Sequence, residues 1–218
     1  MKKDTIQAIL KSKIIAIIRG YDAETCLKIS ESLYKGGINL IEVTFNQAVE
    51  ESHVDTAAVI KAINDRFNGD VLAGAGTVIT MQQLQMAADA QAKYIISPNT
   101  DTKIIQKTCE LGLVSMPGAF TPTEILTAYT HGADFVKLFP ADCLGEGYMK
   151  AISAPINHVP LLAVGGVNEK NIGQYIKLGF KGVGVGSSLT NKEWIASGEY
   201  NKITELARKF VQNIMGQA

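Results

Sequence analysis

Lys137 is the residue whose surroundings most strongly suggest chemistry. It lies within residues 134–140 (DFVKLFP), an apolar run with the length of a buried strand. Burial disfavours the charged ammonium and lowers the pKa of the amine, and the neutral amine is the form that attacks a carbonyl carbon to make a Schiff base. Lys137 is therefore either a surface lysine whose stem lies along apolar groups or a nucleophile.

Short apolar runs alternate with helical stretches along the whole chain. We expect eight strands, near residues 13–19, 38–45, 71–76, 93–97, 113–117, 133–139, 160–165 and 182–186. Helical periodicity is found over residues 23–35, 56–66, 81–90, 123–130, 170–178 and 198–215. Eight repeats predict an α/β fold, a (β/α)8 TIM barrel that forms a single domain over residues 1–218.

An open doubly wound sheet is the alternative architecture. Such a sheet usually carries a glycine-rich dinucleotide turn after its first strand. This chain has Arg19-Gly20-Tyr21-Asp22 at that position, which does not match the fingerprint. The barrel is therefore the preferred prediction.

Polar residues that end the expected strands are the candidates for a site, because barrel chemistry occurs at the C-terminal ends of the strands. They are Arg19, Glu42, Thr44, Thr77 and Lys137, and the fourth strand ends at Ser97-Pro98. Side chains alternate along a strand, so Glu42 shares a side with Thr44, and Lys137 shares a side with Phe139. If both sides face inward, Glu42 and Lys137 point into one cavity, either as reacting groups or as a structural ion pair.

Two glycine-rich turns follow the last two strands. They contain Gly165 and Gly166, and then Gly186, Ser187 and Ser188. Barrels often bind phosphate at this place through backbone N–H groups, which glycine lets a ligand approach closely. The alternative is a pair of tight turns without a ligand.

Composition excludes several kinds of partner. Lys plus Arg and Asp plus Glu both number 21, so no basic excess favours nucleic acid. The apolar run at residues 14–18 is too short for a membrane span or a signal sequence. We expect no membrane partner and a cytoplasmic location.

Cysteines and histidines give no metal pattern. The three cysteines are far apart and are expected to be reduced thiols: Cys26, Cys109 and Cys143. The three histidines are expected at helix or loop surfaces: His53, His131 and His158. No His, Asp or Glu cluster has metal-ligand spacing, so we expect no metal and no other cofactor, and the amine of Lys137 is favoured as the reacting group.

The chain resembles the 2-keto-3-deoxy-6-phosphogluconate (KDPG) and 4-hydroxy-2-oxoglutarate (KHG) aldolases, which are class I, Schiff-base enzymes. The motifs that carry the resemblance lie at residues 14–19 (IIAIIR), 36–44 (GGINLIEVT), 74–77 (GAGT), 96–98 (ISP), 116–118 (MPG), 135–140 (FVKLFP) and 165–167 (GGV). The resemblance implies that Lys137 forms the imine, Glu42 is the general acid and base, and Thr77 contacts the pyruvyl carboxylate. It also implies a phosphate site at Gly165, Gly166, Gly186 and Ser188, and a homotrimer.

Two positions depart from the family pattern. Asn46 stands where some members have an arginine for the substrate carboxylate, and Ala163-Val164 replaces a frequent Pro-Thr pair. We therefore assign Arg19 to the carboxylate. Asn46, Pro98-Asn99 and Val164 look more like the branch that cleaves the galactonate epimer. The residues expected to bind the substrate are Arg19, Thr44, Asn46, Thr77, Pro98 and Phe139, and Ser187 joins the phosphate group.

The expected reaction cleaves KDPG to pyruvate and glyceraldehyde 3-phosphate, with 4-hydroxy-2-oxoglutarate as a further candidate substrate. The alternative is the galactonate epimer, cleaved by the same mechanism. More distant alternatives are a phosphate-binding isomerase or epimerase, in which Glu42 abstracts a proton, and a barrel that binds ligands without catalysis.

Overall fold

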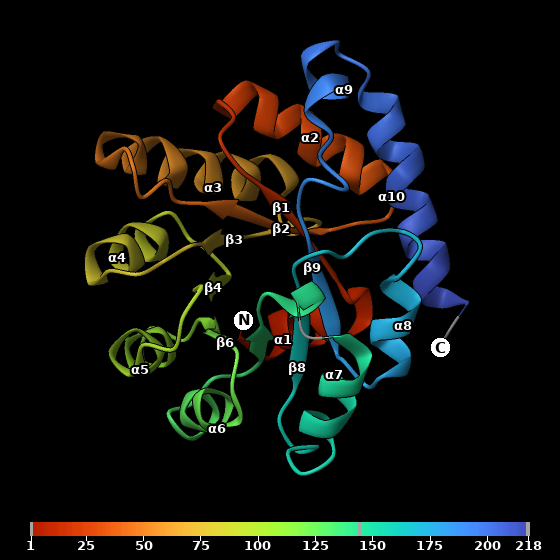
Figure 1. Cartoon of the computed structure of the whole chain (residues 1–218). Coiled ribbons are helices and arrows are strands. Elements are labelled where there is room, and N and C mark those ends of the chain that lie inside the picture. Colours follow the sequence, from red (N-terminus) through yellow and green to blue (C-terminus); the bar gives the residue numbers. More distant parts are fainter. Residues whose placement is uncertain (1, 144, 217–218) are drawn as a thin grey trace.

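The computed structural model describes residues 2–143 and 145–216, and its strands form one parallel barrel (Figure 1). The strands are β1 (Ile14–Ile18), β2 (Leu40–Thr44), β3 (Leu72–Gly76), β4 (Tyr94–Ile96), β5 (Val114–Met116), β6 (Gly118–Ala119), β7 (Val136–Leu138), β8 (Leu161–Val164) and β9 (Gly182–Val185). Their order is β5-β4-β3-β2-β1-β9-β8-β7-β6, and every pairing is parallel.

The barrel closes at Pro117. Strands β5 and β6 stand at opposite ends of the order, but only Pro117 separates them in sequence. Ser97 N donates to Met116 O on one side of this segment, and Lys137 N donates to Pro117 O at 2.9 Å on the other. The two short strands are thus one barrel strand, and the prediction of eight strands in a TIM barrel is confirmed.

Helices surround the strands as an outer ring (Figure 1). They are α2 (Ala23–Lys35), α3 (His53–Phe67), α4 (Met81–Asp89), α5 (Thr102–Glu110), α6 (Pro122–Thr130), α7 (Gly145–Ser153), α8 (Ile172–Lys177), α9 (Lys192–Ala196) and α10 (Tyr200–Met215). Short 3-10 turns occur at η1 (Glu50–Ser52) and η2 (Ala141–Cys143). The strand ends and the helices expected from periodicity lie close to their expected positions, whereas α5, α7 and α9 fall outside the expected helical stretches.

Helix α1 (Lys2–Ser12) precedes the first strand and was not expected from the sequence. It contacts β1, β5 and β9 and lies behind β8 and β9 in Figure 1. Ile9 of α1 joins a core inside the barrel that includes Leu40, Tyr94 and Phe135. This helix therefore covers the end of the barrel opposite the strand C-termini.

The interior core confirms the predicted facing of the strands. Leu40 and Phe135 belong to the inner core, whereas Ile41 and Val43 pack in the outer core between strands and helices. Because side chains alternate, Glu42 follows Leu40 inward and Lys137 follows Phe135 inward. The sequence pattern thus predicted correctly which side chains reach the interior.

Candidate active site

Lys137 lies in the middle of β7 with its side chain inside the barrel. The residue is 7% exposed, and its Nζ lies 4.6 Å from the centroid of the Phe139 ring. Burial lowers the pKa of the Lys137 amine below its ordinary value; the positive charge of Arg19 adds to this effect and Glu42 opposes it. An amine in this environment loses its proton more readily and becomes nucleophilic.

Glu42 approaches the same interior space from β2. It is 3% exposed, and β2 pairs Thr44 with Gly76, the glycine against which the Glu42 carboxylate rests. Burial raises the pKa of the Glu42 carboxyl, while the charges of Lys137 and Arg19 lower it. The described ion pairs do not include Glu42 with Lys137, so the two groups interact through space without a direct salt bridge.

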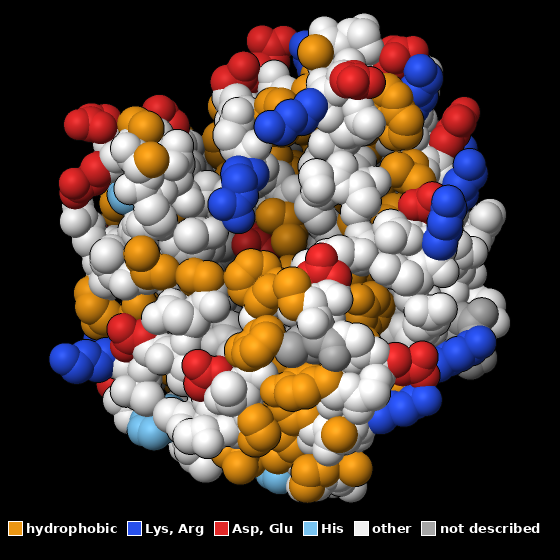
Figure 2. Space-filling model, viewed as in Figure 1, with side chains coloured by type: hydrophobic (Ala, Val, Ile, Leu, Met, Phe, Trp, Pro, Cys, Tyr) orange, Lys and Arg blue, Asp and Glu red, His pale blue; other side chains and the backbone are white. Residues whose placement is uncertain are grey.

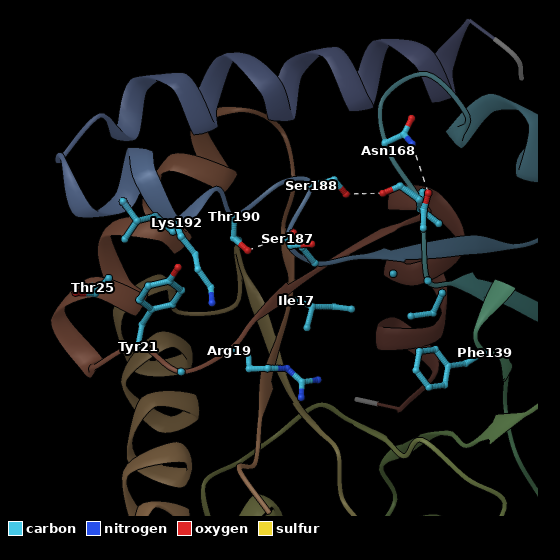
Figure 3. A pocket seen from close by; sticks show the side chains of 18 of the residues that line it. Ile17, Arg19, Tyr21, Thr25, Phe139, Asn168, Ser187, Ser188, Thr190 and Lys192 are labelled. Carbon is cyan, nitrogen blue, oxygen red and sulfur yellow. Dashed lines mark hydrogen bonds between the residues drawn. The ribbon is translucent and has the colours of Figure 1, made fainter. Parts of the chain in front are cut away.

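A cavity of about 1150 Å³ lies next to this pair, and Figure 3 shows it from close by. Lys137 and Glu42 do not themselves line it; their neighbours Phe139 and Arg19 do. Arg19 extends into it from the end of β1, and Phe139 forms another part of its wall. Both residues adjoin Lys137, since Phe139 contacts its amine and Arg19 influences its pKa. Figure 2 shows the corresponding hollow near the centre of this face.

The two glycine-rich turns line the same cavity. Gly165 and Gly166 both have positive φ, at 106° and 67°, a conformation that other residues rarely adopt. Within the described chain, a set of backbone N–H groups in these turns has no hydrogen-bond acceptor: those of Gly165, Gly166, Val167, Ser187 and Ser188. Adjacent free N–H groups of this kind are suited to an anion.

The two predicted serines differ in their contacts. Ser187 is exposed, and its hydroxyl has no partner among the described residues. The Ser188 hydroxyl donates to the carbonyl of Val167 and so ties the two turns together. Ser188 can therefore offer an anion its backbone N–H, while its hydroxyl proton is already used.

The remaining predicted substrate residues differ in burial and in the cavity that they line. Thr44 is 5% exposed, and its hydroxyl has no hydrogen-bond partner in the described chain. Thr77 is partly buried just after β3, and Pro98 is partly buried just after β4. Asn46 is exposed and lies with Thr44 in a neighbouring cavity of about 530 Å³, where its side-chain oxygen accepts from Ala48 N.

Comparisons with known proteins decide the family. The profile described as "Aldolase: KDPG and KHG aldolase" matches residues 6–206. This chain belongs to the KDPG and KHG aldolase family. It is therefore an enzyme, a carbon–carbon lyase, and the barrel and the resemblance seen in the sequence are confirmed.

Relatives of this aldolase have related substrates in their names. The chain is 35% identical to a probable 2-dehydro-3-deoxy-6-phosphogalactonate aldolase of Rhizobium meliloti (strain 1021), covering 83% of this chain and 82% of the relative. It is 30% identical to a 2-dehydro-3-deoxy-phosphogluconate aldolase of Treponema pallidum (strain Nichols), covering 94% and 95%. A crystal structure of the Legionella pneumophila KDPG aldolase, with pyruvate captured as a covalent carbinolamine, has a TM-score of 0.83, 29% identity, and coverage of 93% and 96%.

A polar network beside the site of this aldolase was not predicted. Gln83, which is 1% exposed, donates from Nε2 to Gln47 Oε1 at 2.8 Å, and Gln47 Nε2 donates to Thr77 O at 2.8 Å. Thr77 has a φ of 57°, a strained value for a β-branched residue. The network thus holds the strained turn that follows β3.

The surface position expected for His53 is wrong. His53 is 8% exposed, its ring packs edge-on against Phe45, and its Nε2 lies 3.0 Å from the carbonyl oxygen of Asn46. It also lies beside Gln83, at 3.4 Å between Nε2 atoms. His53 is buried because it is the first residue of α3 and its imidazole ring packs against Phe45 and the loop that follows β2.

Other groups of the aldolase offer no comparable cluster. Among residues 2–143 and 145–216, no three His, Cys, Asp or Glu side chains are placed to hold a metal ion. The three cysteines are unpaired, and burial raises the pKa of the Cys26 thiol to about 12, so this thiol is unreactive. In the same described part, no helix has the length and apolar character needed to cross a bilayer.

Proposed function

We propose that this chain is a class I aldolase that cleaves a 2-keto-3-deoxy-6-phospho sugar acid to pyruvate and glyceraldehyde 3-phosphate. The observation that carries the proposal is the interior pair: a buried Lys137 with a lowered pKa beside a buried Glu42 with a raised one. The lowered pKa makes the Lys137 amine a better nucleophile, and the raised pKa brings the Glu42 carboxyl closer to neutral pH, where it can carry protons. The covalent pyruvate carbinolamine in the Legionella relative supports the same chemistry.

The reaction begins when the neutral Lys137 amine adds to the C2 ketone. Glu42 moves the protons needed for the resulting carbinolamine to lose water and become an iminium ion. Glu42 then takes the proton of the C4 hydroxyl, the C3–C4 bond breaks, and its electrons pass to the iminium to form an enamine. Glu42 returns a proton to C3, and water hydrolyses the imine to pyruvate and the free amine.

Substrate binding is shared between two ends of the cavity. Arg19 pairs with the carboxylate, because its guanidinium is close enough to influence both reacting groups and has no described ion-pair partner. Thr77 and the unpartnered hydroxyl of Thr44 supply further hydrogen bonds near the pyruvyl end. The free N–H groups of the glycine-rich turns and Ser187 bind the phosphate.

The remaining predicted contacts have smaller parts. Phe139 is 37% exposed and covers one side of Lys137, so it excludes water from the imine. Pro98 and Asn46 border the substrate on the β4 and β2 sides. The iminium is itself the electron sink, so the proposed reaction uses no metal, and full activity after dialysis against a chelator is the expected result.

Two epimers are the candidate substrates. The gluconate form is the one named by the Treponema relative, which matches nearly the whole chain. The galactonate form is favoured by Asn46 and Val164 and by the higher identity, 35%, to the Rhizobium relative. 4-Hydroxy-2-oxoglutarate, which has no phosphate, is a third and slower candidate.

A side-by-side rate comparison tests the proposal. Pyruvate release is measured with lactate dehydrogenase for both phosphorylated epimers and for 4-hydroxy-2-oxoglutarate at equal enzyme concentration. The expected result is turnover of at least one phosphorylated epimer, with the ratio of kcat/KM values naming the preferred one. Absence of pyruvate from all three would contradict the proposed function.

We also propose a homotrimer and a cytoplasmic location. Several large apolar side chains are exposed beside the cavity face, and Figure 2 shows hydrophobic side chains spread across that face. They include Val49, Val54, Ile79, Met81 and Phe120. Exposed apolar groups of this size are commonly covered by another protein surface.

A further inference from the structure

The cavity lined by Arg19 and Phe139 carries positive charge from two residues. Arg19 and Lys192 are the basic residues in its wall, and none of the described aspartates or glutamates lines it. Neither basic side chain belongs to a described ion pair. Two unpaired cations in one cavity favour a ligand with two anionic groups.

Lys192 is the first residue of α9, a short helix that is held in place. Asn191 Oδ1 accepts hydrogen bonds from Glu193 N at 2.9 Å and Trp194 N at 3.1 Å, which fixes the start of α9. Ile195 of the same short helix is 7% exposed and anchors it in the core. Figure 3 shows the Lys192 amine directed into the cavity, between the ring of Tyr21 and the side chain of Arg19.

Tyr21 forms part of the cavity wall beside Lys192. Its hydroxyl is buried and has no hydrogen-bond partner in the described chain. The Tyr21 ring lines the same cavity as Lys192 and Ser187. Because this hydroxyl is enclosed by the protein, a ligand in the cavity would meet the face of the Tyr21 ring and not its oxygen.

Lys192 and Arg19 differ in their influence on Lys137 and Glu42. The charge of Arg19 influences the pKa of both Lys137 and Glu42, whereas Lys192 is not among the charges that shift either one. The carboxylate must stay near Arg19, because it is bonded to the keto carbon that Lys137 attacks. Lys192 therefore faces the far end of the substrate, on the side of the unoccupied N–H groups of Ser187 and Ser188.

We propose that Lys192 binds the phosphate of the substrate together with the two glycine-rich turns, and that it sets the preference for phosphorylated over unphosphorylated keto acids. This inference rests on the proposed aldolase function. An ammonium group adds a charge-assisted hydrogen bond to the neutral N–H donors of the turns. Because Lys192 is remote from the reacting pair, it acts on binding and leaves the proton transfers unchanged.

The test compares the preferred phosphorylated epimer with 4-hydroxy-2-oxoglutarate in Lys192→Met, Lys192→Arg and the wild type. For Lys192→Met we expect kcat/KM with the phosphorylated substrate to fall about ten- to hundredfold, mostly through KM, as loss of one charged hydrogen bond implies. With 4-hydroxy-2-oxoglutarate, kcat/KM should stay within about twofold, because its second carboxylate is bonded to C4 and is too close to the breaking bond to reach the phosphate position. Lys192→Arg should retain most of the preference.

Lys202→Met is the matched control, because Lys202 is an exposed lysine that lies 5.8 Å from the Trp194 ring of the same region and pairs with Glu199. It should behave as the wild type with both substrates. Equal losses on both substrates in Lys192→Met, or no loss on either, would overturn the inference while leaving the aldolase function intact. A wild type without activity on any of the substrates would instead remove the proposed function itself.

Discussion

At the scale of single residues, Lys137 and Glu42 influence each other's pKa inside the barrel. The charge of Glu42 raises the pKa of Lys137, and the charge of Lys137 lowers the pKa of Glu42. Both are almost fully buried, and burial is the largest influence on each pKa. Desolvation brings the two ordinarily distant pKa values toward one another, which suits one group for attack and the other for proton transfer. The two pKa values therefore depend on burial, on the interaction between these side chains and on the nearby charge of Arg19.

Replacement of Glu42 tests its role as the proton carrier. We expect Glu42→Gln to lower kcat about 10²- to 10⁴-fold, the usual contribution of a general acid or base. The amide keeps the shape of the side chain but cannot carry the proton, so the fold should persist by circular dichroism. A kcat within about threefold of the wild type would show that another group moves the protons.

The charge of Arg19 gives a prediction about pH. Catalysis needs Lys137 neutral and Glu42 ionised, so kcat/KM should rise with pH through both ionisations. The positive charge of Arg19 lowers both pKa values, and its removal in Arg19→Gln should therefore move the rising limb to higher pH. Arg19→Lys retains the charge and should leave the limb in place. A rising limb that is unchanged in Arg19→Gln would contradict the arrangement.

At the scale of elements, strand β3 makes room for the side chains of its neighbours. A Cβ atom on Gly76 would lie 1.9 Å from Glu42 Oε1, and one on Gly74 would lie 2.1 Å from the Tyr94 ring. Tyr94 fills the inner core and its hydroxyl donates to Leu72 O. The two glycines therefore serve different purposes, one beneath the reactive carboxylate and one in the packed interior.

This difference predicts opposite results for two similar substitutions. Gly76→Ala should displace the Glu42 carboxylate and lower kcat at least about tenfold, with a modest change in stability. Gly74→Ala should overpack the core and lower the free energy of unfolding by about 1–3 kcal/mol. Urea denaturation and pyruvate release measured on both variants give the comparison. Full activity in Gly76→Ala would show that the activity does not require the Glu42 carboxylate to rest against residue 76.

Elements also show what the sequence could and could not predict. The inward facing of Glu42 and Lys137 follows from alternation along single strands, so it was predicted correctly. The network of Gln47, Gln83 and Thr77 joins separate loops, and no local pattern marks such contacts. The position of α1 beneath the barrel likewise depends on the closed strands, because only their interior offers Ile9 an apolar surface.

At the scale of the whole molecule, the closed barrel places the site at one end and α1 at the other. Exposed apolar side chains lie around the site end, including Ile79 and Met81 at the start of α4. Ile79 and Met81 are 39% and 47% exposed, so covering each in an interface contributes about 1 kcal/mol, less than complete burial of such a side chain would. The surface around the cavity is therefore the one we expect to meet other copies of the chain.

Light scattering tests the assembly. The wild type should have the mass of about three chains of 23.4 kDa. The double variant Ile79→Glu with Met81→Glu places charge on the apolar surface and should shift the population toward single chains. A wild-type mass near one chain would contradict the homotrimer.

The most direct test of the account is to trap the imine on Lys137. Wild-type protein is incubated with pyruvate and borohydride, and its intact mass and peptide map are measured. We expect one reduced pyruvyl group, located on Lys137, in the wild type and in a control with exposed Lys181→Ala, and none in Lys137→Ala. An adduct that persists in Lys137→Ala, or no adduct in the wild type, would contradict the assignment of Lys137 as the Schiff-base lysine.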